Sequence, residues 1–273
     1  MNNTASFSLK DKVIVVTGGT GILGEAFIHG IANAGGIVGL LGRNEKVAEE
    51  RVASITGKGG QAIALLADVT QKDQLMEARK KLVDTYGKID GLVNAAGGNI
   101  PGAVVQPGEN VFDLNMSALK EVMDLNLFGT LLPTQVFGEA IHQHGRGSIV
   151  NISSMAPQRA ITRVLGYSMA KAAIDIYTKW FSVELGKRYG DTIRMNAIAP
   201  GFFLTEQNRT LLTNEDGTMT ERGSLITKNT PFNRLGEPSE LVGALIWLLS
   251  DASQFVTGTV INVDGGFSVF SGV

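Results

Sequence analysis

The feature that most constrains the fold of this 273-residue sequence is a series of short apolar runs separated by amphipathic, helix-like stretches. Seven such runs occur, at 13–16, 37–41, 62–66, 91–93, 148–152, 193–198 and 260–263. Many of the helix-like stretches end at a glycine, such as Gly57, Gly87 and Gly145, as helices commonly do. Continuous apolar runs alternating with helices are typical of a parallel sheet that is buried on both faces. The sequence therefore predicts an α/β fold, doubly wound, with helices on both faces of a parallel sheet.

The domain organisation follows from the uniform composition of the sequence. No linker, repeat or low-complexity tract divides it, so we expect residues 1–273 to form a single domain with an N-terminal tail at 1–11. After the sixth apolar run, a long polar connection extends over about 202–230. Long connections in compact domains are usually functional, and we expect this one to be a lid over the substrate.

Composition excludes several classes of function. The formal net charge is −2 and 18% of residues are charged, so no basic surface is expected to bind nucleic acid or a membrane. The absence of cysteine excludes disulfides, thiolate metal sites and cysteine nucleophiles, and fits a reducing cytosol. The first eleven residues lack the pattern of a signal peptide. We therefore expect a cytoplasmic protein that needs no metal.

A glycine-rich segment follows the first apolar run directly. Gly19, Gly21 and Gly24 form G-x-G-x-x-G between a predicted strand and a predicted helix, which is the context of a dinucleotide site in a Rossmann-type fold. Small residues let the backbone approach a pyrophosphate, and the helix N-terminus stabilises its charge. The predicted contacts with this part of the cofactor are Gly18, Gly19, Thr20, Gly21, Ile22, Leu23 and Gly24.

The end of the second run bears on the choice between NAD and NADP. An acidic residue is expected there in an NAD enzyme, but the sequence has Gly42, followed by Arg43 and Asn44. A missing acid and an available guanidinium favour the 2′-phosphate of NADP. Arg43 facing water, with Glu45 reaching the ribose, is the alternative. Asp68 and Val69, after the third run, are placed to meet the adenine.

Tyr167 and Lys171 are the candidates for acid–base chemistry. They stand four residues apart in a helix-like stretch, so their side chains project from one face. A free tyrosine has a pKa near 10, and a neighbouring cation lowers it by favouring the phenolate. Many tyrosines with such a lysine are merely solvated neighbours, so the spacing needs support from elsewhere in the sequence.

That support comes from motifs in a fixed order along the sequence. They are Asn94-Ala95-Ala96-Gly97 after the fourth run, Asn126 in a helical stretch, Ser154 after the fifth run, and Pro200-Gly201 with Thr205 after the sixth. With them the protein resembles the short-chain dehydrogenase/reductases over essentially its full length. One departure is Ile22, which stands where that family usually has a glycine. The resulting T-G-x-x-G-x-x-G is similar to the extended branch of the superfamily.

The resemblance implies a role for each motif. Tyr167 would exchange a proton with the substrate oxygen, Lys171 would lower the tyrosine pKa and hold the nicotinamide ribose, and Ser154 would bind the substrate oxygen. Asn126 would support a water that leads from Lys171 to solvent. The implied cofactor is NAD(P)(H), with further contacts at Asn94, Ala95, Ala96, Gly97, Tyr167, Lys171, Pro200, Gly201, Phe203 and Thr205.

In the family that the protein resembles, substrate specificity lies in three stretches. They are the loop after Gly97, the stretch between Ser154 and Tyr167, and the insertion after Pro200. The polar and basic candidates in them are Asn99, Ser154, Gln158, Arg159, Arg163, Gln207, Asn208 and Arg209. Several hydrogen-bonding groups beside arginines suit a polyhydroxy acid, although a polar surface loop would look the same. Within the family, the stretches resemble those of the D-mannonate oxidoreductases (fructuronate reductases), a branch usually assigned NAD. The conflict with the prediction from Arg43 stays open.

Other functions remain as alternatives. The enzyme could resemble the gluconate 5-dehydrogenases, or reduce another carbonyl such as a 3-oxoacyl thioester, a steroid or a polyol. A non-catalytic cofactor sensor is a third possibility, although a sensor needs no proton relay. The resemblance also implies a homotetramer, and the large aromatic residues, Trp180 among them, are expected to pack in the core or between subunits.

Overall fold

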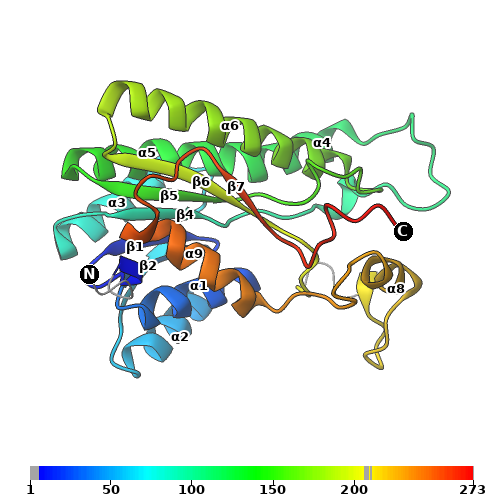
Figure 1. The fold of residues 1–273 in the computed structure, drawn as a ribbon, viewed down its shortest axis with the longest axis horizontal. Helices are drawn as coiled ribbons and strands as arrows, with labels where there is room; N and C mark the ends of the chain where they lie inside the picture. Colours follow the sequence, from blue (N-terminus) through cyan, green and yellow to red (C-terminus); the bar gives the residue numbers. More distant parts are fainter. Residues whose placement is uncertain (1–5, 206–208, 210, 273) are drawn as a thin grey trace.

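Seven parallel strands form one sheet in the order β3-β2-β1-β4-β5-β6-β7 in the computed structural model, which describes residues 6–205, 209 and 211–272 (Figure 1). The strands are β1 (Val13–Thr17), β2 (Ile37–Gly42), β3 (Gln61–Leu66), β4 (Gly91–Asn94), β5 (Gly147–Ile152), β6 (Ile193–Pro200) and β7 (Val260–Val263). The main helices are α1 (Ile22–Asn33), α2 (Glu45–Thr56), α3 (Lys72–Tyr86), α4 (Met116–Met123), α5 (Gly129–His144), α6 (Leu165–Tyr189), α8 (Glu221–Lys228) and α9 (Val242–Leu249).

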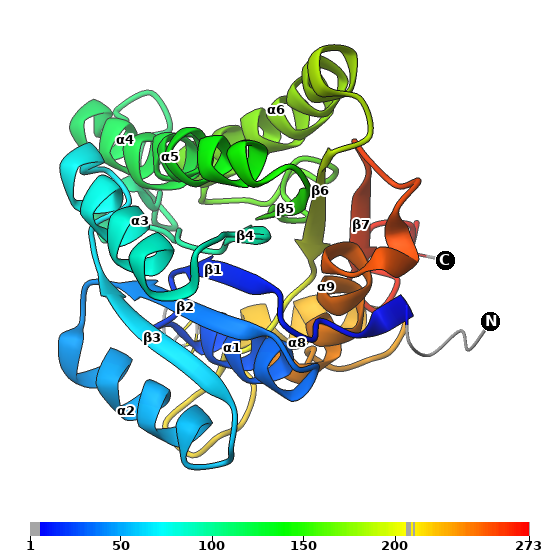
Figure 2. The same cartoon turned by 90° about the vertical axis from the view of Figure 1, so that its left-hand side faces the viewer.

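Helices cover both faces of this sheet. One core contains buried residues of α3, α5 and α6, such as Leu82, Phe137 and Leu185. The opposite core contains residues of α1, α2 and α9, such as Phe27 and Leu248. Figure 2 shows the two helical layers above and below the twisted sheet. The predicted doubly wound α/β fold is therefore confirmed.

The seven predicted runs match the seven strands, but their burial differs with position in the sheet. Every residue of β1, β2, β4 and β6 is buried, as predicted for strands covered on both faces. In β3 and β7 most residues are partly or fully exposed. These two strands are the edges of the sheet, where one side has no neighbouring strand. Full burial is therefore a property of the central strands.

The long connection after β6, where we expect the lid, is tied together at its base. Gly236 donates its N–H to the carbonyl of Phe202 over 2.9 Å, and Phe203 and Gly236 form an isolated parallel bridge. Between them lie a tight turn, in which Asn214 N–H donates to Thr218 O over 2.8 Å, and the helix α8. Figure 1 shows α8 beyond the carboxyl ends of the strands, away from the main helical layers.

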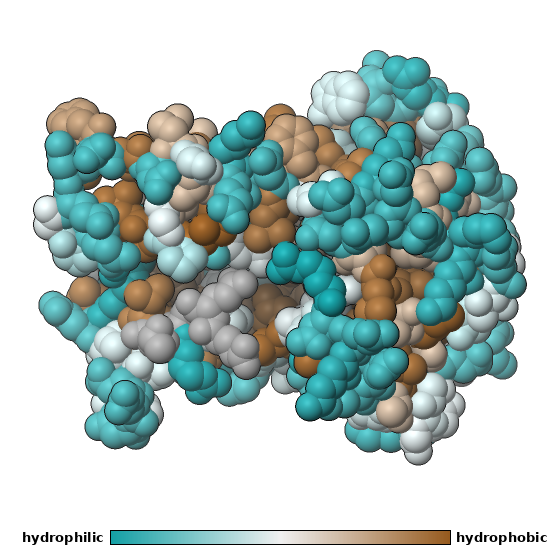
Figure 3. Space-filling view, turned by 180° about the vertical axis from the view of Figure 1, so that it is seen from behind, coloured by the Kyte–Doolittle hydropathy of each residue, from teal (hydrophilic) through white to brown (hydrophobic). Residues whose placement is uncertain are grey.

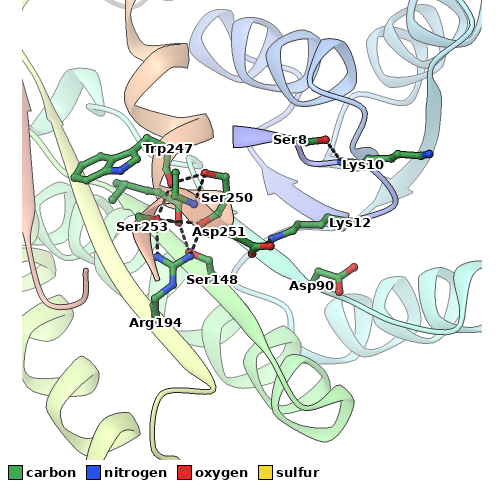
Figure 4. Close-up of polar contacts among 12 residues, drawn as sticks. Ser8, Lys10, Lys12, Asp90, Ser148, Arg194, Trp247, Ser250, Asp251 and Ser253 are labelled. Carbon is green, nitrogen blue, oxygen red and sulfur yellow. Dashed lines mark hydrogen bonds and ion pairs between the residues drawn. The ribbon is translucent and has the colours of Figure 1, made fainter. Parts of the chain in front are cut away.

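A buried arginine stabilises the other end of the sheet, where the strands begin, opposite the lid. Arg194 in β6 donates to Ser253 Oγ over 2.9 Å and to Ser250 O over 3.1 Å (Figure 4). Ser148 in β5 donates to the carbonyl of Leu248 over 2.7 Å. Burial lowers the pKa of Arg194, the charge of Asp251 opposes that shift, and Arg146 adds to it. These contacts fix the C-terminal part of the protein to the sheet, so we assign this cluster a structural role.

Candidate active site

The candidate site lies at the carboxyl ends of the central strands. The strand order reverses between β1 and β4, because β2 and β3 lie on one side of β1 while β5 to β7 lie beyond β4. Connections from β1 and β4 diverge at this point and leave a crevice, where doubly wound folds bind their ligands. The sequence-predicted motifs after β1, β4, β5 and β6 all end at this edge.

The glycine-rich turn between β1 and α1 has the geometry of a phosphate cradle. Gly18 has φ +66°, and a Cβ there would lie 2.8 Å from the backbone N of Ala96. Only glycine suits this conformation and this close approach. Gly21 precedes α1 and no side chain caps the helix, so the amides of its first turn are available to an anion. These residues fit the pyrophosphate of a dinucleotide.

Two sets of contacts that the sequence did not predict hold this turn in place, those of Arg51 and those of Thr17, the first residue of the T-G-x-x-G-x-x-G motif. Arg51 in α2 donates to the carbonyls of Gly19 over 2.6 Å and Gly21 over 2.9 Å, and pairs with Glu25. Thr17 Oγ1 accepts hydrogen bonds from the amides of Ala95 and Ala96, over 3.0 and 3.1 Å. Both contacts join segments that are far apart in sequence. Spacing along the sequence carries no sign of them.

Gly42, which stands where an acid is expected, lies against Thr20 at the adenosine end of the crevice. A Cβ at Gly42 would lie 2.7 Å from Thr20 Cγ2 and 2.8 Å from Thr20 Oγ1, so a larger residue there would require the Thr20 side chain to move. Arg43 points outward, with 74% of its side chain exposed, and its Nη1 lies 3.4 Å from Asp68 Oδ2. Such an exposed ion pair is weak, which leaves the guanidinium able to turn to a ligand. Asn44 instead caps α2 by accepting from Val47 N–H over 3.2 Å.

A buried polar network lies behind the nicotinamide side of the crevice. Asn94 Nδ2 donates to Thr134 Oγ1 and to Asn151 Oδ1, both over 2.9 Å, and Asn151 continues the network to Thr178. These bonds join β4 and β5 to the helices α5 and α6. Asn94 is 2% exposed, and these bonds of its Nδ2 position the end of β4; the predicted contact with the cofactor stays a prediction.

Asn126 lies in a π-helical turn (Asp124–Phe128) between α4 and α5 and is fully buried. Its side chain exchanges two hydrogen bonds with the backbone of Gly98, accepting from the N–H over 3.0 Å and donating to the carbonyl over 2.7 Å. A Cβ on Gly97 would lie 2.6 Å from Asn126 Oδ1 and 3.5 Å from Lys171 Nζ. Asn126 and Lys171 therefore converge on Gly97, and small local insertions such as π-turns are frequent at functional sites.

Ser154, Tyr167 and Lys171 lie together at the end of β5 and the first turns of α6. The hydroxyl of Ser154 hydrogen-bonds Tyr167 and accepts from the N–H of Ala156 over 3.2 Å. Lys171 Nζ lies 5.5 Å from the centre of the Tyr167 ring and donates to the carbonyl of Ile152 over 2.7 Å. The phenol, the hydroxyl and the ammonium thus face one space, as a proton relay requires.

The pKa of Tyr167 is raised in the structure, whereas the sequence predicts that a neighbouring cation lowers it. Burial raises the pKa of Tyr167, and the hydrogen bond with Ser154 lowers it. Burial also lowers the pKa of Lys171 to about 8, while the charge of Asp175 raises it. Asp175 accepts a hydrogen bond from the hydroxyl of Ser153. For Tyr167, desolvation therefore outweighs the hydrogen bond with Ser154, and its pKa lies above the ordinary value.

A cavity of about 550 Å³ opens in front of these residues, next to the lid. Figure 3 shows the molecule hollowed on this side, with apolar residues in the walls. Much of the lining is apolar, including Leu23, Met155 and Phe203. The polar and charged residues of the lining are Asn99, Gln106, Ser153, Ser154, Tyr167, Lys171, Thr205 and Arg222.

Two of the predicted substrate residues, Gln158 and Arg159, have partners away from the cavity. Gln158 hydrogen-bonds Asn262, and Arg159 donates to the carbonyls of Ser268 over 2.8 Å and Phe270 over 3.1 Å. Neither residue lines the cavity, because the C-terminal segment, which runs alongside, supplies their partners. The structure therefore places both residues outside the lining of this cavity.

The remaining substrate candidates divide into three groups. Asn99 and Ser154 line the cavity. Arg163 lies outside the lining and hydrogen-bonds the side chain of Gln106, which belongs to it. Arg209 is exposed in the lid, and Gln207 and Asn208 lie outside the described residues. Arg222 lines the cavity although the sequence did not indicate it, because nothing in its local pattern shows which way α8 faces.

Membrane spans and metal clusters are both absent from the described residues. No helix in that part of the protein is long and apolar enough to cross a membrane. Nor do the residues that the structure describes include a group of three or more His, Cys, Asp or Glu placed to hold a metal ion.

Known proteins resemble this one over nearly all its length. A family model described as Enoyl-(Acyl carrier protein) reductase matches residues 20–268. A Haemophilus influenzae structure with bound NAD, provisionally named a D-mannonate oxidoreductase, is 39% identical with a TM-score of 0.90, and each of the two sequences is covered to 100%.

Two further relatives have similar coverage. The oxidoreductase UxuB of Bacillus subtilis (strain 168), which is described as uncharacterised, is 39% identical over 97% of this sequence and 98% of its own. A gluconate 5-dehydrogenase from Burkholderia cenocepacia J2315, in complex with NADP and tartrate, is 30% identical with a TM-score of 0.85, covering 96% of this sequence and 97% of its own. The protein therefore belongs to the short-chain dehydrogenase/reductase family and is an NAD(P)-dependent oxidoreductase.

Proposed function

We propose that this oxidoreductase interconverts a keto and a hydroxy group on a sugar acid, with D-fructuronate and D-mannonate as the favoured pair. The observation that carries the proposal is the cluster of Ser154, Tyr167 and Lys171 at a cavity that also presents Asn99, Gln106 and Arg222. The relative provisionally named a D-mannonate oxidoreductase supports the choice of pair. The reaction is D-fructuronate + NAD(P)H + H⁺ ⇌ D-mannonate + NAD(P)⁺.

The residues of the cluster divide the proton chemistry among them. Bound nicotinamide supplies or accepts the hydride. In reduction, the hydroxyl of Ser154 donates a hydrogen bond to the carbonyl oxygen, and Tyr167 gives that oxygen its proton. Lys171 carries positive charge next to the phenolate that is left, which limits its energetic cost. In oxidation the same groups act in reverse.

Asn126 positions the loop that borders the site. Asn126 clamps Gly98 from both its N–H and its carbonyl, so it fixes the loop that carries Asn99 into the cavity. We propose that it also supports a water between Lys171 and solvent, through which the relay recovers its proton. Phe203 and Thr205 line the cavity from the lid side, where they would contact the nicotinamide.

A second candidate is a gluconate 5-dehydrogenase-like activity. The relative in complex with NADP and tartrate favours it, since tartrate is itself a hydroxy acid. To separate the candidates, we would follow nicotinamide absorbance with fructuronate, 5-ketogluconate, a 3-oxoacyl thioester, a ketosteroid and a neutral ketose. The highest kcat/KM should belong to fructuronate. Preference for the thioester or the steroid would contradict a sugar-acid enzyme.

For the cofactor we propose a preference for NADP, which rests on Arg43. The end of β2 carries no acid at Gly42, and the exposed side chain next to it that can meet a 2′-phosphate is that of Arg43. Arg43→Ala should weaken NADPH binding about 10- to 150-fold, the range expected for a hydrogen bond to a charged group, and leave NADH binding nearly unchanged. Equal affinity of wild type and variant for NADPH would show that the preference is misassigned. Fluorescence titration of both cofactors measures it.

A further inference from the structure

Arg222 is the cationic side chain that the lid contributes to the lining of the cavity, as far as the structure describes the lid. It lies in the first turn of α8, and Tyr167, Ser154 and Lys171 line the same cavity from the sheet and α6. The position of α8 is tightly set, because a Cβ on the next residue, Gly223, would overlap the carbonyl of Leu212. Arg222 is therefore held at the cavity by the packing of its helix.

The hydrogen bonds of Arg222 leave most of its capacity unused. Nη1 lies 3.3 Å from Thr162 Oγ1, and Nη2 lies 3.3 Å from the carbonyl of Thr162. Both distances exceed the usual N–H···O range of about 2.7–3.2 Å, so these bonds are weak. A guanidinium has five N–H donors, and a contact with Thr162 alone leaves the others for a ligand.

A second guanidinium lies within electrostatic range and adds to the positive potential. Burial lowers the pKa of Arg222, and the charge of Arg163 lowers it further. Arg163 itself donates to the carbonyl of Val105 over 3.1 Å and to the side chain of Gln106, both neutral partners. Among residues 6–205, 209 and 211–272, no carboxylate forms an ion pair with either arginine. Two like charges without a counter-charge are costly unless an anion binds between or beside them.

We propose that Arg222, assisted by the charge of Arg163, binds the carboxylate of the substrate and thereby selects sugar acids over neutral sugars. The inference rests on the proposed function, because it gives the charged end of that substrate a binding partner opposite the reacting end. A guanidinium binds a carboxylate through two parallel hydrogen bonds, which fixes the orientation as well as the charge. The substrate would then connect the lid to the catalytic cluster, so acids would hold α8 in place over the cavity.

The kinetic test compares Arg222→Met and Arg222→Lys with Lys228→Met in the full-length enzyme with cofactor. Lys228 is exposed at the end of the same helix, so its removal changes the same unit of charge away from the cavity. For fructuronate, Arg222→Met should lower kcat/KM about 10- to 150-fold, mainly through KM. Arg222→Lys should restore part of the loss, and Lys228→Met should behave like wild type. A neutral ketose should be reduced equally well by all four proteins.

A binding test separates failure of this inference from failure of the proposed function. D-mannonate and D-mannitol differ only in a carboxylate against a CH₂OH, and each is titrated by calorimetry into the enzyme saturated with NAD(P)H. Tighter binding of mannonate that is lost in Arg222→Met supports the carboxylate site, even if the enzyme proves to turn over a different acid. Equal binding of the two ligands, or a preference for mannonate that survives in Arg222→Met, overturns it.

Discussion

At the scale of single residues, Tyr167 carries the sharpest prediction. Tyr167→Phe removes the hydroxyl that shares a hydrogen bond with Ser154 and leaves the ring in place. General acid–base catalysis contributes about 10²- to 10⁴-fold, so kcat should fall by at least about 10²-fold. Cofactor affinity should stay within about threefold, because the substitution removes one hydroxyl and leaves the Gly18 turn intact.

The measurements for Tyr167→Phe are steady-state turnover and a titration of NAD(P)H fluorescence. Ser168→Ala is a suitable control, since the Ser168 hydroxyl donates to the carbonyl of Val164, the residue before α6, and Ser168 does not line the cavity. Retention of more than about a tenth of wild-type turnover would rule out the phenol as the proton donor.

Lys171 carries a prediction on stability and pH. Its pKa is about 8 in the folded protein and 10.5 in the reference state, so the unfolded protein binds the proton more tightly. The cost of burying the charge is therefore full below pH 8 and disappears between pH 8 and 10.5. Lys171→Met should be more stable than wild type at pH 7, by at most about 3 kcal/mol, although it loses activity.

The direction in which the stability difference between Lys171→Met and wild type changes with pH tests the prediction. Thermal unfolding of both proteins should show the advantage of Lys171→Met shrinking as pH rises from about 7 to about 10. An advantage that grows over this range would mean that the pKa of Lys171 is raised in the folded state. The prediction also explains why a costly buried ammonium is kept at this place, because its charge serves the proton chemistry of Tyr167.

At the scale of elements, the strands were the most predictable part of the molecule. The apolar runs match all seven strands within two residues at each end, because a buried parallel strand leaves a continuous apolar signature. The resemblance to the family is also confirmed. The direction in which side chains point was not predictable. Arg159 and Arg222 are both arginines next to polar residues, yet the C-terminal segment binds the first and α8 brings the second to the cavity.

Other features of the site could not be predicted because they depend on contacts between segments that are distant in sequence. The sequence shows that the acid is missing at Gly42, and the structure adds that the side chain of Thr20 packs against this position. Arg51 and Thr17 hold the cofactor turn through partners that lie far from them in sequence. Local patterns report on local conformation and burial, so they miss residues whose partners are supplied by the fold.

The lid carries a prediction that concerns a whole element. Gly223→Ala would push α8 away from Leu212, because the new Cβ would overlap a backbone carbonyl that cannot give way cheaply. We expect KM for the acid substrate to rise at least about fivefold and stability to fall by about 1–3 kcal/mol, the usual cost of overpacking. Cofactor affinity should change little.

The matched control is Gly186→Ala in α6. Nothing lies within 4 Å of a Cβ at Gly186, so alanine should stabilise the helix by about 0.5–1 kcal/mol with unchanged KM. Chemical denaturation and steady-state kinetics measure both variants. If Gly223→Ala kept the wild-type KM, the placement of α8 would not matter for the substrate.

At the scale of the whole molecule, α6 joins the catalytic residues to an apolar surface. Tyr167 and Lys171 line the cavity from this helix, while Ile176, Trp180 and Val183 on it are 63%, 60% and 55% exposed. Three large apolar side chains with helical spacing form a stripe that is costly to leave in water. We propose that this stripe packs against a second copy of the protein, as one of the two interfaces that a homotetramer needs.

Replacing part of the stripe tests the assembly. Ile176→Glu and Trp180→Glu place a charge in the proposed interface. We expect each to reduce the mass in solution from that of the proposed homotetramer, four times the 29.0 kDa subunit, to two subunits or one. Lys187→Glu, which changes charge at the exposed end of α6, should leave the mass unchanged. Light scattering after size exclusion measures all four proteins. Activity should fall together with assembly, because α6 also positions Tyr167 and Lys171. A wild-type protein that runs at the mass of one subunit would refute the proposed interface.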